Sequence, residues 1–120
     1  MLIFALILAA PAPLTEIHQR DISCVVEIAV LANAQKRGIV AGSDVQAKGR
    51  RWAGIVGDRI MTETDQPREL VAVAMNEAAK ARAARADDGA TLDACVRQMN
   101  AELAIADASD APLPKPVKKQ

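Results

Sequence analysis

The sequence predicts an all-α fold, a compact four-helix bundle of orthogonal or up-down type that is stapled by one disulfide. Three observations favour this fold class. Good helix formers dominate long stretches such as 72–86, where Val73 is the only β-branched residue. Apolar residues recur at helical spacing between capping and glycine signals. The chain of 120 residues has room for one domain, and its two cysteines are the even count typical of a disulfide framework.

The N-terminus has the pattern of a secretory signal. Residues 1–10 form an uncharged apolar run that ends in small residues, and this run is too short for a membrane-spanning helix, which needs about 20 residues. We predict a signal peptide over residues 1–12 and a mature chain that is periplasmic or secreted. The signal is atypical, because it lacks Lys and Arg and because Pro13 would follow the cleavage site. The alternatives are a retained N-terminal membrane anchor and a cytosolic protein whose first helix is hydrophobic.

The helical domain is predicted over residues 15–106, and its first helix runs between Thr15 and Arg37. Thr15 is a suitable N-cap, and Gly38 suits the position that follows the last turn. The middle of this helix is apolar on nearly every side, and only Glu27 interrupts it. Because a helix that is apolar all round is buried, we expect this helix to be the hub of the fold.

A second helix is predicted to start at a capping box, in which the side chains of Ser43 and Gln46 bind each other's backbone N–H groups. Gly49, Gly54 and Gly57 are unfavourable inside a helix. We therefore expect a close approach to a neighbouring helix at these glycines, or else a bent segment. The inward-facing positions of this helix are expected to be Val45, Trp52, Val56 and Ile60.

A third helix is predicted to begin with Asp65 or Gln66 as its cap and with Pro67 in its first turn. Residues 87–89 are expected to end it. Its inward stripe is expected to contain Leu70, Val71, Ala74, Met75, Ala78 and Ala81. Its solvated face is expected to carry Lys80, Arg82 and Arg85.

A fourth helix is predicted to start at Thr91, which is a suitable N-cap. Its inward positions are expected to be Leu92, Cys95, Val96, Met99 and Leu103. Residues 107–120 turn polar and then contain three prolines in five residues, a composition that precludes a helix there. We predict a disordered tail over this range.

The two cysteines, Cys24 and Cys95, fall on the inward faces of the predicted first and fourth helices. We predict one disulfide between them, and closing a loop of that length stabilises a fold by about 4 kcal/mol in the chain-entropy model. The alternative is two buried thiols in a cytosolic protein. A metal site and a cofactor are not predicted, because structural zinc needs four Cys or His ligands and the chain adds only His18 to the two cysteines.

A basic stretch lies between residues 36 and 59, where only Asp44 and Asp58 oppose the cations, although the whole chain has 15 acids and 15 bases. If the first two helices pack antiparallel, its two ends come close together. The patch that would bind an anionic partner consists of Lys36, Arg37, Lys48, Arg50 and Arg51, with Arg59 further along. A lipid head group, a glycan or an acidic protein would fit this chemistry. A solvated helix face is the alternative, and nucleic acid is not expected because stacking aromatics are missing from the stretch beyond Trp52.

No catalytic constellation is evident. His18 is the only histidine, no serine or cysteine nucleophile adjoins it, and we expect it at the surface. The carboxylates are spread along the helices without an apolar-flanked pair. An enzyme that uses His18 with one of these carboxylates stays an alternative.

The function that follows is a non-enzymatic binding or structural protein of the periplasm or cell envelope, acting on a macromolecular partner. A second hypothesis is an envelope-associated protein that binds anionic lipid or glycan through the basic stretch at 36–59. A cytosolic regulator of the helix-turn-helix kind is a further alternative, which the hydrophobic N-terminus disfavours.

Overall fold

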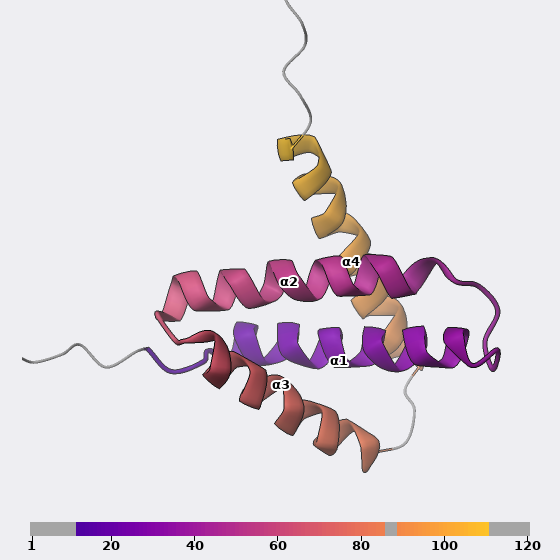
Figure 1. Ribbon diagram of the computed structural model, residues 1–120, viewed down its shortest axis with the longest axis horizontal. Coiled ribbons are helices and arrows are strands. Elements are labelled where there is room, and N and C mark those ends of the chain that lie inside the picture. The colour runs from indigo at the N-terminus through magenta and orange to yellow at the C-terminus, as the bar shows by residue number, and fades with distance from the viewer. Residues whose placement is uncertain (1–11, 86–88, 111–120) are drawn as a thin grey trace, which may run out of the picture.

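The computed structural model describes residues 12–85 and 89–110. All regular structure within these two ranges is helical, as predicted, and it forms four helices (Figure 1). Their bounds are Glu16–Lys36 for α1, Asp44–Thr64 for α2, Arg68–Ala83 for α3 and Gly89–Asp110 for α4. The predicted signal peptide lies outside the described residues except for its last residue, Ala12.

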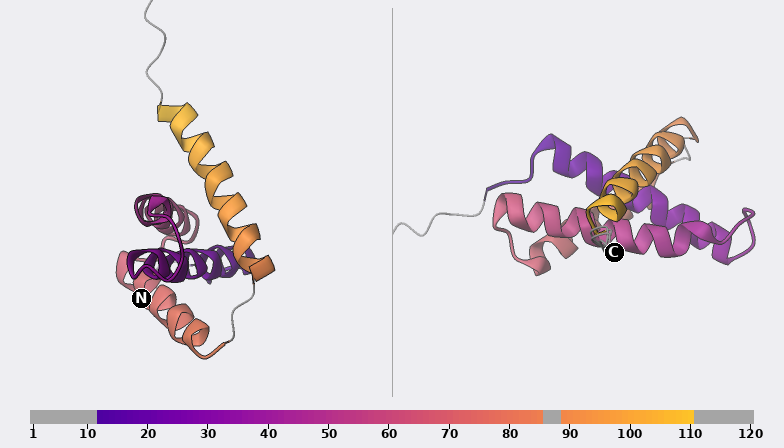
Figure 2. Two further views of the ribbon diagram at one scale, coloured as in Figure 1. Left: turned by 90° about the vertical axis from the view of Figure 1, so that its right-hand side faces the viewer. Right: turned by 90° about the horizontal axis from the view of Figure 1, so that it is seen from above.

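The helices α1 and α2 form an antiparallel hairpin that the other two helices flank (Figure 1). α3 runs diagonally away from one end of the hairpin, and α4 crosses it steeply, so that its C-terminal half projects past α2 (Figure 2). Each flanking helix contacts both α1 and α2, whereas the described parts of α3 and α4 do not contact each other. α1 therefore touches all three other helices, as expected of a hub.

The core lies where the hairpin meets α4 and the start of α3. Trp52, Val56 and Ile60 of α2 are fully buried, which confirms the inward face predicted for this helix. They pack with residues of the other helices, chiefly Ile22, Cys24, Val25, Ile28, Val71, Cys95, Met99 and Leu103. Full burial of α1 is confined to its first two-thirds, and Val30, just after them, is 41% exposed.

The predicted disulfide between Cys24 and Cys95 is present, and it joins α1 to α4 with the two Cα atoms 5.1 Å apart. Both cysteines are buried in the core. The bridge spans 71 positions of sequence and therefore encloses α2 and α3. It is the covalent link between the hub and the helix that projects furthest from it.

The N-terminus of α1 is capped as the sequence predicts, and His18 completes the cap. Thr15 Oγ1 accepts a hydrogen bond from the N–H of His18, and His18 Nδ1 accepts one from the N–H of Thr15. Three residues before this cap, the chain is hydrogen-bonded to the end of α2: the N–H of Ala12 donates to the carbonyl of Thr64, and Gln66 Nε2 donates to the carbonyl of Ala12. Cleavage after residue 12, the predicted signal site, would remove both of these bonds.

The predicted capping box of α2 is not formed. Ser43 precedes the helix with φ −145° and ψ 1°, and its side chain makes no cap hydrogen bond. Gln35 of α1 takes over this role, because its Oε1 accepts from the N–H of Val45 at 3.3 Å. A side chain of α1 thus accepts a hydrogen bond from a backbone N–H group in the first turn of α2.

The three glycines of α2 have different surroundings. A Cβ at Gly49 would lie 2.8 Å from Ile28 Cγ2, so the close approach expected here is confirmed at this residue. Gly54 has nothing within 4 Å, and Gly57 would meet only Met75 Cε at 4.0 Å. The helix is continuous through all three, so the alternative of an irregular segment is wrong.

The turn between α2 and α3 differs from the prediction. Asp65 adopts a left-handed conformation, with φ 56°, and ends α2 instead of capping α3. Pro67 stands just before α3 as its N-cap residue and not within its first turn. The short polar side chain of aspartate tolerates the left-handed region, which is why it can end a helix here in place of glycine.

The inward face of α3 is narrower than predicted. Val71 is buried, and Ala74, Met75 and Ala78 are half-buried, but Leu70 is 50% exposed and Ala81 is also exposed. The buried and half-buried residues of α3 are spaced three or four apart and therefore share one narrow face, so Leu70, one position before Val71, stays in solvent. The same face includes position 82, four residues past Ala78.

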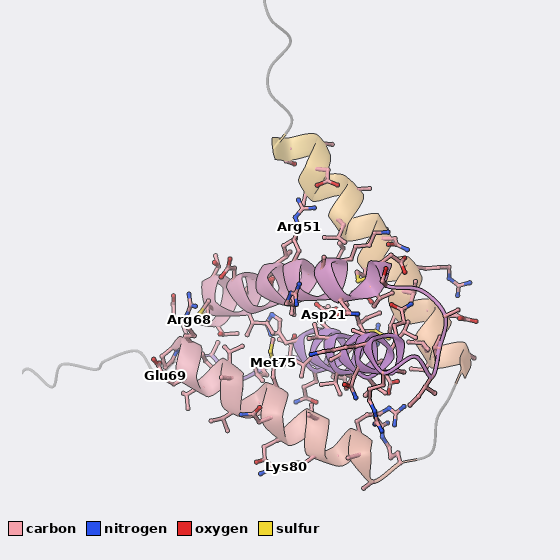
Figure 3. All side chains as sticks on the ribbon, turned by 45° about the vertical axis from the view of Figure 1, so that its right-hand side comes forward. Asp21, Arg51, Arg68, Glu69, Met75 and Lys80 are labelled. Atoms are coloured by element: carbon pink, nitrogen blue, oxygen red, sulfur yellow. A yellow bond between two sulfur atoms is a disulfide. The ribbon has the colours of Figure 1, made fainter. Side chains whose placement is uncertain are left out.

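Arg82 is therefore buried, which corrects its predicted place on the solvated face. Its Nε donates to Glu27 Oε1, and both side chains are less than one-tenth exposed. Glu27 is the lone acid of the apolar part of α1, and a buried carboxylate requires a cationic partner. Lys80 and Arg85 are exposed, as expected; Figure 3 shows Lys80 pointing away from the fold.

The fourth helix is longer at both ends than predicted. It begins at Gly89, two residues before the proposed cap Thr91, and it runs to Asp110. The predicted disordered tail thus overlaps the last turn of α4 at residues 107–110, and the remainder of that tail lies outside the described residues. The inward face is confirmed, with Cys95, Met99 and Leu103 buried and with Leu92 and Val96 half-buried.

Candidate functional site

The residues of the predicted basic patch do not share one surface. Lys36 and Arg50 line the same groove between α1 and α2. Arg51 turns away from it toward α4, where its Nη1 lies 2.6 Å from Asp107 Oδ1 (Figure 3). Adjacent residues on a helix point about 100° apart, so a run of basic residues on a helix divides between faces.

The remaining two patch residues lie at the loop end of the hairpin. Arg37 is the C-cap residue of α1, and Lys48 lies in the first turns of α2 with its Nζ 4.0 Å from Asp44 Oδ2. Together with Lys36 they place three exposed cations around the loop at 38–43. Lys36 and Arg37 make no ion pair with residues 12–85 or 89–110.

The loop itself has an apolar tip that sequence reasoning did not single out. Ile39 is 67% exposed and Val40 is 42% exposed. The loop projects beyond the ends of the neighbouring helices in Figure 1 and in the right-hand view of Figure 2. Gly38 and Gly42, both with positive φ, let the chain make its two bends, and the two apolar residues lie between them. Val40 faces back toward Ala34 and Val30 of α1, with which it lines a small hollow, and Ile39 is the more exposed of the two.

The backbone of this loop is hydrogen-bonded internally. The N–H groups of residues 38–40 donate to the carbonyls of Ala34 and Gln35 at 2.9–3.3 Å. The carbonyl of Ala41 accepts from Gln35 Nε2 at 3.3 Å. The loop therefore carries exposed apolar side chains, and three of its N–H groups and one of its carbonyls have partners within the protein.

A groove of about 300 Å³ opens beside this loop, between α1 and α2. Its floor consists of small or apolar residues, namely Val25, Ala29, Ala32, Gly49 and Ala53. Its polar lining consists of Asn33, Lys36, Gln46 and Arg50, and none of its lining residues is acidic. The groove stays open because the side chains between α1 and α2 are small.

A second, smaller groove continues along the same face of α2. It has a volume of about 180 Å³, lies between α2 and α3, and shares Ala53 with the first groove. Gly57 and Met75 contribute to its floor, and Asp58 and Arg68 are its charged lining residues.

A polar network joins α1, α2 and α4; its residues Asp21 and Trp52 are buried, and Arg59, Gln98 and Glu102 are half-buried. Gln98 Nε2 donates to Asp21 Oδ1 at 2.8 Å and to Glu102 Oε2 at 2.9 Å. Glu102 Oε1 accepts from Trp52 Nε1 at 3.2 Å and from Arg59 Nη2. Asp21, which lies in the layer between α1 and α2 (Figure 3), also pairs with Arg59, whose Nη1 is 3.6 Å from its Oδ2. Arg59 of the predicted basic stretch is thus used inside the fold.

The charges of this network stabilise each other. Burial alone would raise the pKa of Glu102, but hydrogen bonds from Gln98, Arg59 and Trp52 and the charge of Arg59 outweigh burial and lower this pKa. Burial would likewise lower the pKa of Arg59, and the bond and charge of Glu102, helped by Asp21 and Glu63, raise it. Both groups therefore stay ionised, and the network acts as a fixed brace between helices.

His18 is buried, so its predicted place at the surface is wrong. It lies four residues before Ile22, on the face of α1 that packs in the core, and that spacing was the signal that could have located it. Its Nδ1 accepts from the N–H of Thr15, and its Nε2 lies 3.3 Å from Glu63 Oε2. Both ring nitrogens are used within the fold, and His18 lines neither of the two grooves.

Within the described residues, no group of three His, Cys, Asp or Glu side chains could hold a metal ion. None of the four helices combines the length and the apolar character that crossing a bilayer demands. Comparisons with known proteins find no matching family model, no similar curated protein and no similar solved structure. The geometry of the loop and of the grooves is therefore the basis for a functional proposal.

Proposed function

We propose that this chain is a non-enzymatic protein of the periplasm or cell envelope that docks on anionic lipid surfaces through the loop end of the α1–α2 hairpin. The observation that carries this proposal is the exposed pair Ile39 and Val40 in a projecting loop, with Lys36 and Arg37 directly before the loop and Lys48 in the first turns of α2 after it. Apolar side chains can enter the boundary between head groups and acyl chains, while cations beside them meet anionic head groups.

The internal hydrogen bonds of the loop support this use. Backbone N–H and C=O groups that lack partners are costly in a low-polarity environment. In this loop the N–H groups of residues 38–40 and the carbonyl of Ala41 already have partners within the protein. The tip can therefore enter the lipid interface without leaving these groups unsatisfied.

The size of the surface favours reversible docking. Complete burial of an Ile or Val side chain contributes about 1.5–3 kcal/mol, and each cation close to an anionic membrane contributes about 1 kcal/mol. Two partly buried apolar residues and three cations are therefore sufficient for weak, salt-sensitive binding. They are insufficient for permanent anchoring, for which even one myristoyl chain is marginal.

The proposed location rests on two features. A buried disulfide is typical of proteins that fold in an oxidising compartment. The apolar run at residues 1–10 has the pattern of a secretory signal, with a retained anchor as the alternative. We take the four helices to form a compact orthogonal bundle, which the steep crossing of α4 supports.

Co-sedimentation with phosphatidylglycerol and with phosphatidylcholine vesicles tests the docking proposal. The double variant Ile39→Ser/Val40→Ser is compared with Leu70→Ser/Val73→Ser, a matched pair of exposed apolar residues on α3. Every variant keeps the same N-terminus, so residues 1–12 contribute equally throughout. We expect the wild type and the α3 variant to bind the anionic vesicles at low salt, and the loop variant to bind about tenfold more weakly.

Equal binding of the two double variants would contradict the proposal, as would binding that does not depend on lipid charge. Raising the salt concentration should weaken the binding of the wild type, because exposed charges are screened over about 10 Å at 0.1 M salt.

A further inference from the structure

The groove between α1 and α2 has a polarity gradient along its length. On α1, the residues facing the groove pass from Val25 and Ala29 to Lys36, a distance of about 16 Å at 1.5 Å per residue. On the antiparallel α2, Arg50 follows Gly49, which packs against Ile28, so Arg50 lies further from the loop than Lys36 does. In an α-helix each side chain leans toward the N-terminus, so Lys36 and Arg50 lean toward each other along the groove, and Val25 and Ala53 form its apolar end.

We propose that this groove binds a single-chain anionic amphiphile, with its anionic group at Lys36 and Arg50 and its acyl chain along the floor. A fatty acid and a lysophospholipid share this chemistry. The source of the ligand rests on the proposed function. The loop would contact the lipid surface, and the groove beside it would bind one single-chain lipid molecule from that surface.

Charge complementarity selects an anion for this groove. Neither Lys36 nor Arg50 makes an ion pair with the described parts of the chain, and no lining residue is acidic. The amides of Asn33 and Gln46 lie among the lining residues and can donate further hydrogen bonds. An oxyanion placed there would meet two charges and two amides.

The shape of the floor selects a thin apolar chain. At Gly49 the two helices approach so closely that a Cβ would collide with Ile28, which closes the groove from below. Ala29 and Ala53 keep its width open, because any longer side chain would fill it. The groove is thus preformed by close helix packing, as ligand sites generally are.

The length of the site extends past the first groove. The second groove begins at the shared residue Ala53 and continues over Gly57 to Met75. A longer chain can therefore run on along α2. A ligand of this kind is expected to bind more tightly as its chain lengthens, by severalfold for each methylene that is buried.

Isothermal titration calorimetry with monomeric amphiphiles, below their micelle-forming concentration and without vesicles, tests the site. Laurate and lauroyl-lysophosphatidylglycerol distinguish a free fatty acid from a lipid as the source, and dodecanol serves as the uncharged probe of equal chain length. We expect binding of one anionic molecule per chain, at least tenfold weaker binding of dodecanol, and weaker binding of octanoate than of laurate.

Two variants and their controls assign the binding to this groove. Ala29→Leu fills the floor from an exposed position and should abolish laurate binding, whereas Ala79→Leu at an exposed position of α3 should not. Arg50→Ala should weaken laurate binding about fivefold, whereas Arg20→Ala, an exposed cation on α1, should not. Unchanged thermal unfolding of these variants shows that each still folds.

Three results would overturn the inference: binding of none of the anionic probes, equal binding of dodecanol and laurate, or equal effects of each variant and its control. Binding of an acidic helical peptide in place of the amphiphiles would do the same. The amphiphile proposal and the docking proposal can fail independently. Ile39→Ser/Val40→Ser should lose vesicle binding and keep laurate binding. Ala29→Leu should lose laurate binding and keep vesicle binding.

Discussion

Buried charges in this protein act between helices that are distant in sequence. Glu27 of α1 pairs with Arg82 of α3, and Glu102 of α4 accepts hydrogen bonds from Trp52 and Arg59 of α2. Removing one member of the Glu27–Arg82 pair leaves the other buried without this partner, and this costs more than the pair itself contributes. Removing Glu102 deprives the buried Trp52 Nε1 and the half-buried Arg59 of an ionised acceptor. Each residue of these pairs is therefore important for stability, although none of them lines the proposed amphiphile groove.

The substitution Glu102→Gln tests the network at the residue scale. At neutral pH it should lower the free energy of unfolding by about 2 kcal/mol, because hydrogen bonds to an ionised acceptor are stronger than those to an amide. The fold lowers the pKa of Glu102 below its ordinary value of 4.5, so the ionised carboxylate stabilises the protein above that value. This contribution is lost as the pH falls through the lowered pKa.

The difference in the free energy of unfolding between wild type and Glu102→Gln should consequently have its full size at pH 7 and be smaller at pH 3. Urea unfolding at the two pH values measures it. Asp58→Asn, which changes an exposed carboxylate of α2, is the matched control and should alter stability by less than about 0.5 kcal/mol. A difference that grows in acid would contradict the assignment.

At the scale of elements, the connection between α1 and α2 is organised by one side chain. Gln35 accepts from the N–H of Val45 and donates to the carbonyl of Ala41, so it holds both the loop and the start of α2. Local capping residues were expected to do this, but Ser43 makes no cap bond. The conformation of the loop proposed for lipid docking therefore depends on these two hydrogen bonds of Gln35.

We expect Gln35→Ala to destabilise the protein by about 1 kcal/mol, as the loss of a helix cap does, and to loosen the loop. Hydrogen exchange of the Val45 amide should become faster, and vesicle binding should weaken. Gln19→Ala, at an exposed position on the same helix, is the control and should change neither. Unchanged exchange at Val45 in Gln35→Ala would show that Gln35 does not hold the loop.

At the scale of the whole molecule, the hairpin holds together two helices that do not touch each other in the described structure. α4 depends on its contacts with α1 and α2 and on the disulfide from Cys24 to Cys95. A small domain buries a limited share of its surface, so a covalent link across its longest loop is a large part of its stability.

Removing this link with Cys24→Ala/Cys95→Ala should lower the free energy of unfolding by about 4 kcal/mol. Urea unfolding followed by circular dichroism measures the loss, and laurate binding at low temperature, where the variant is still folded, should persist because neither cysteine lines the groove. A loss below about 1 kcal/mol would mean that the packing of α4 alone holds the fold.

The features that depend on local pattern could be predicted from the sequence. Capping signals, apolar spacing and alanine content predicted four helices, the cap at Thr15, the central place of α1 and the inward faces of α2 and α4, because these properties act within a few residues. The disulfide followed because two cysteines on inward faces can pair within the chain in one way only.

Which residues meet across the fold is known from the tertiary structure alone. In it His18 and Arg82 are buried, Leu70 is exposed, and Arg59 bonds to Glu102. The residues of the basic stretch lie at a loop, in a groove and in an ion pair. These outcomes depend on helix crossing angles and on partners some 40 to 80 positions away, such as Arg59 with Glu102 and Gln98 with Asp21. A local pattern shows that a residue is polar. The packing of helices that are distant in sequence sets which partner that residue meets, and therefore whether it can be buried.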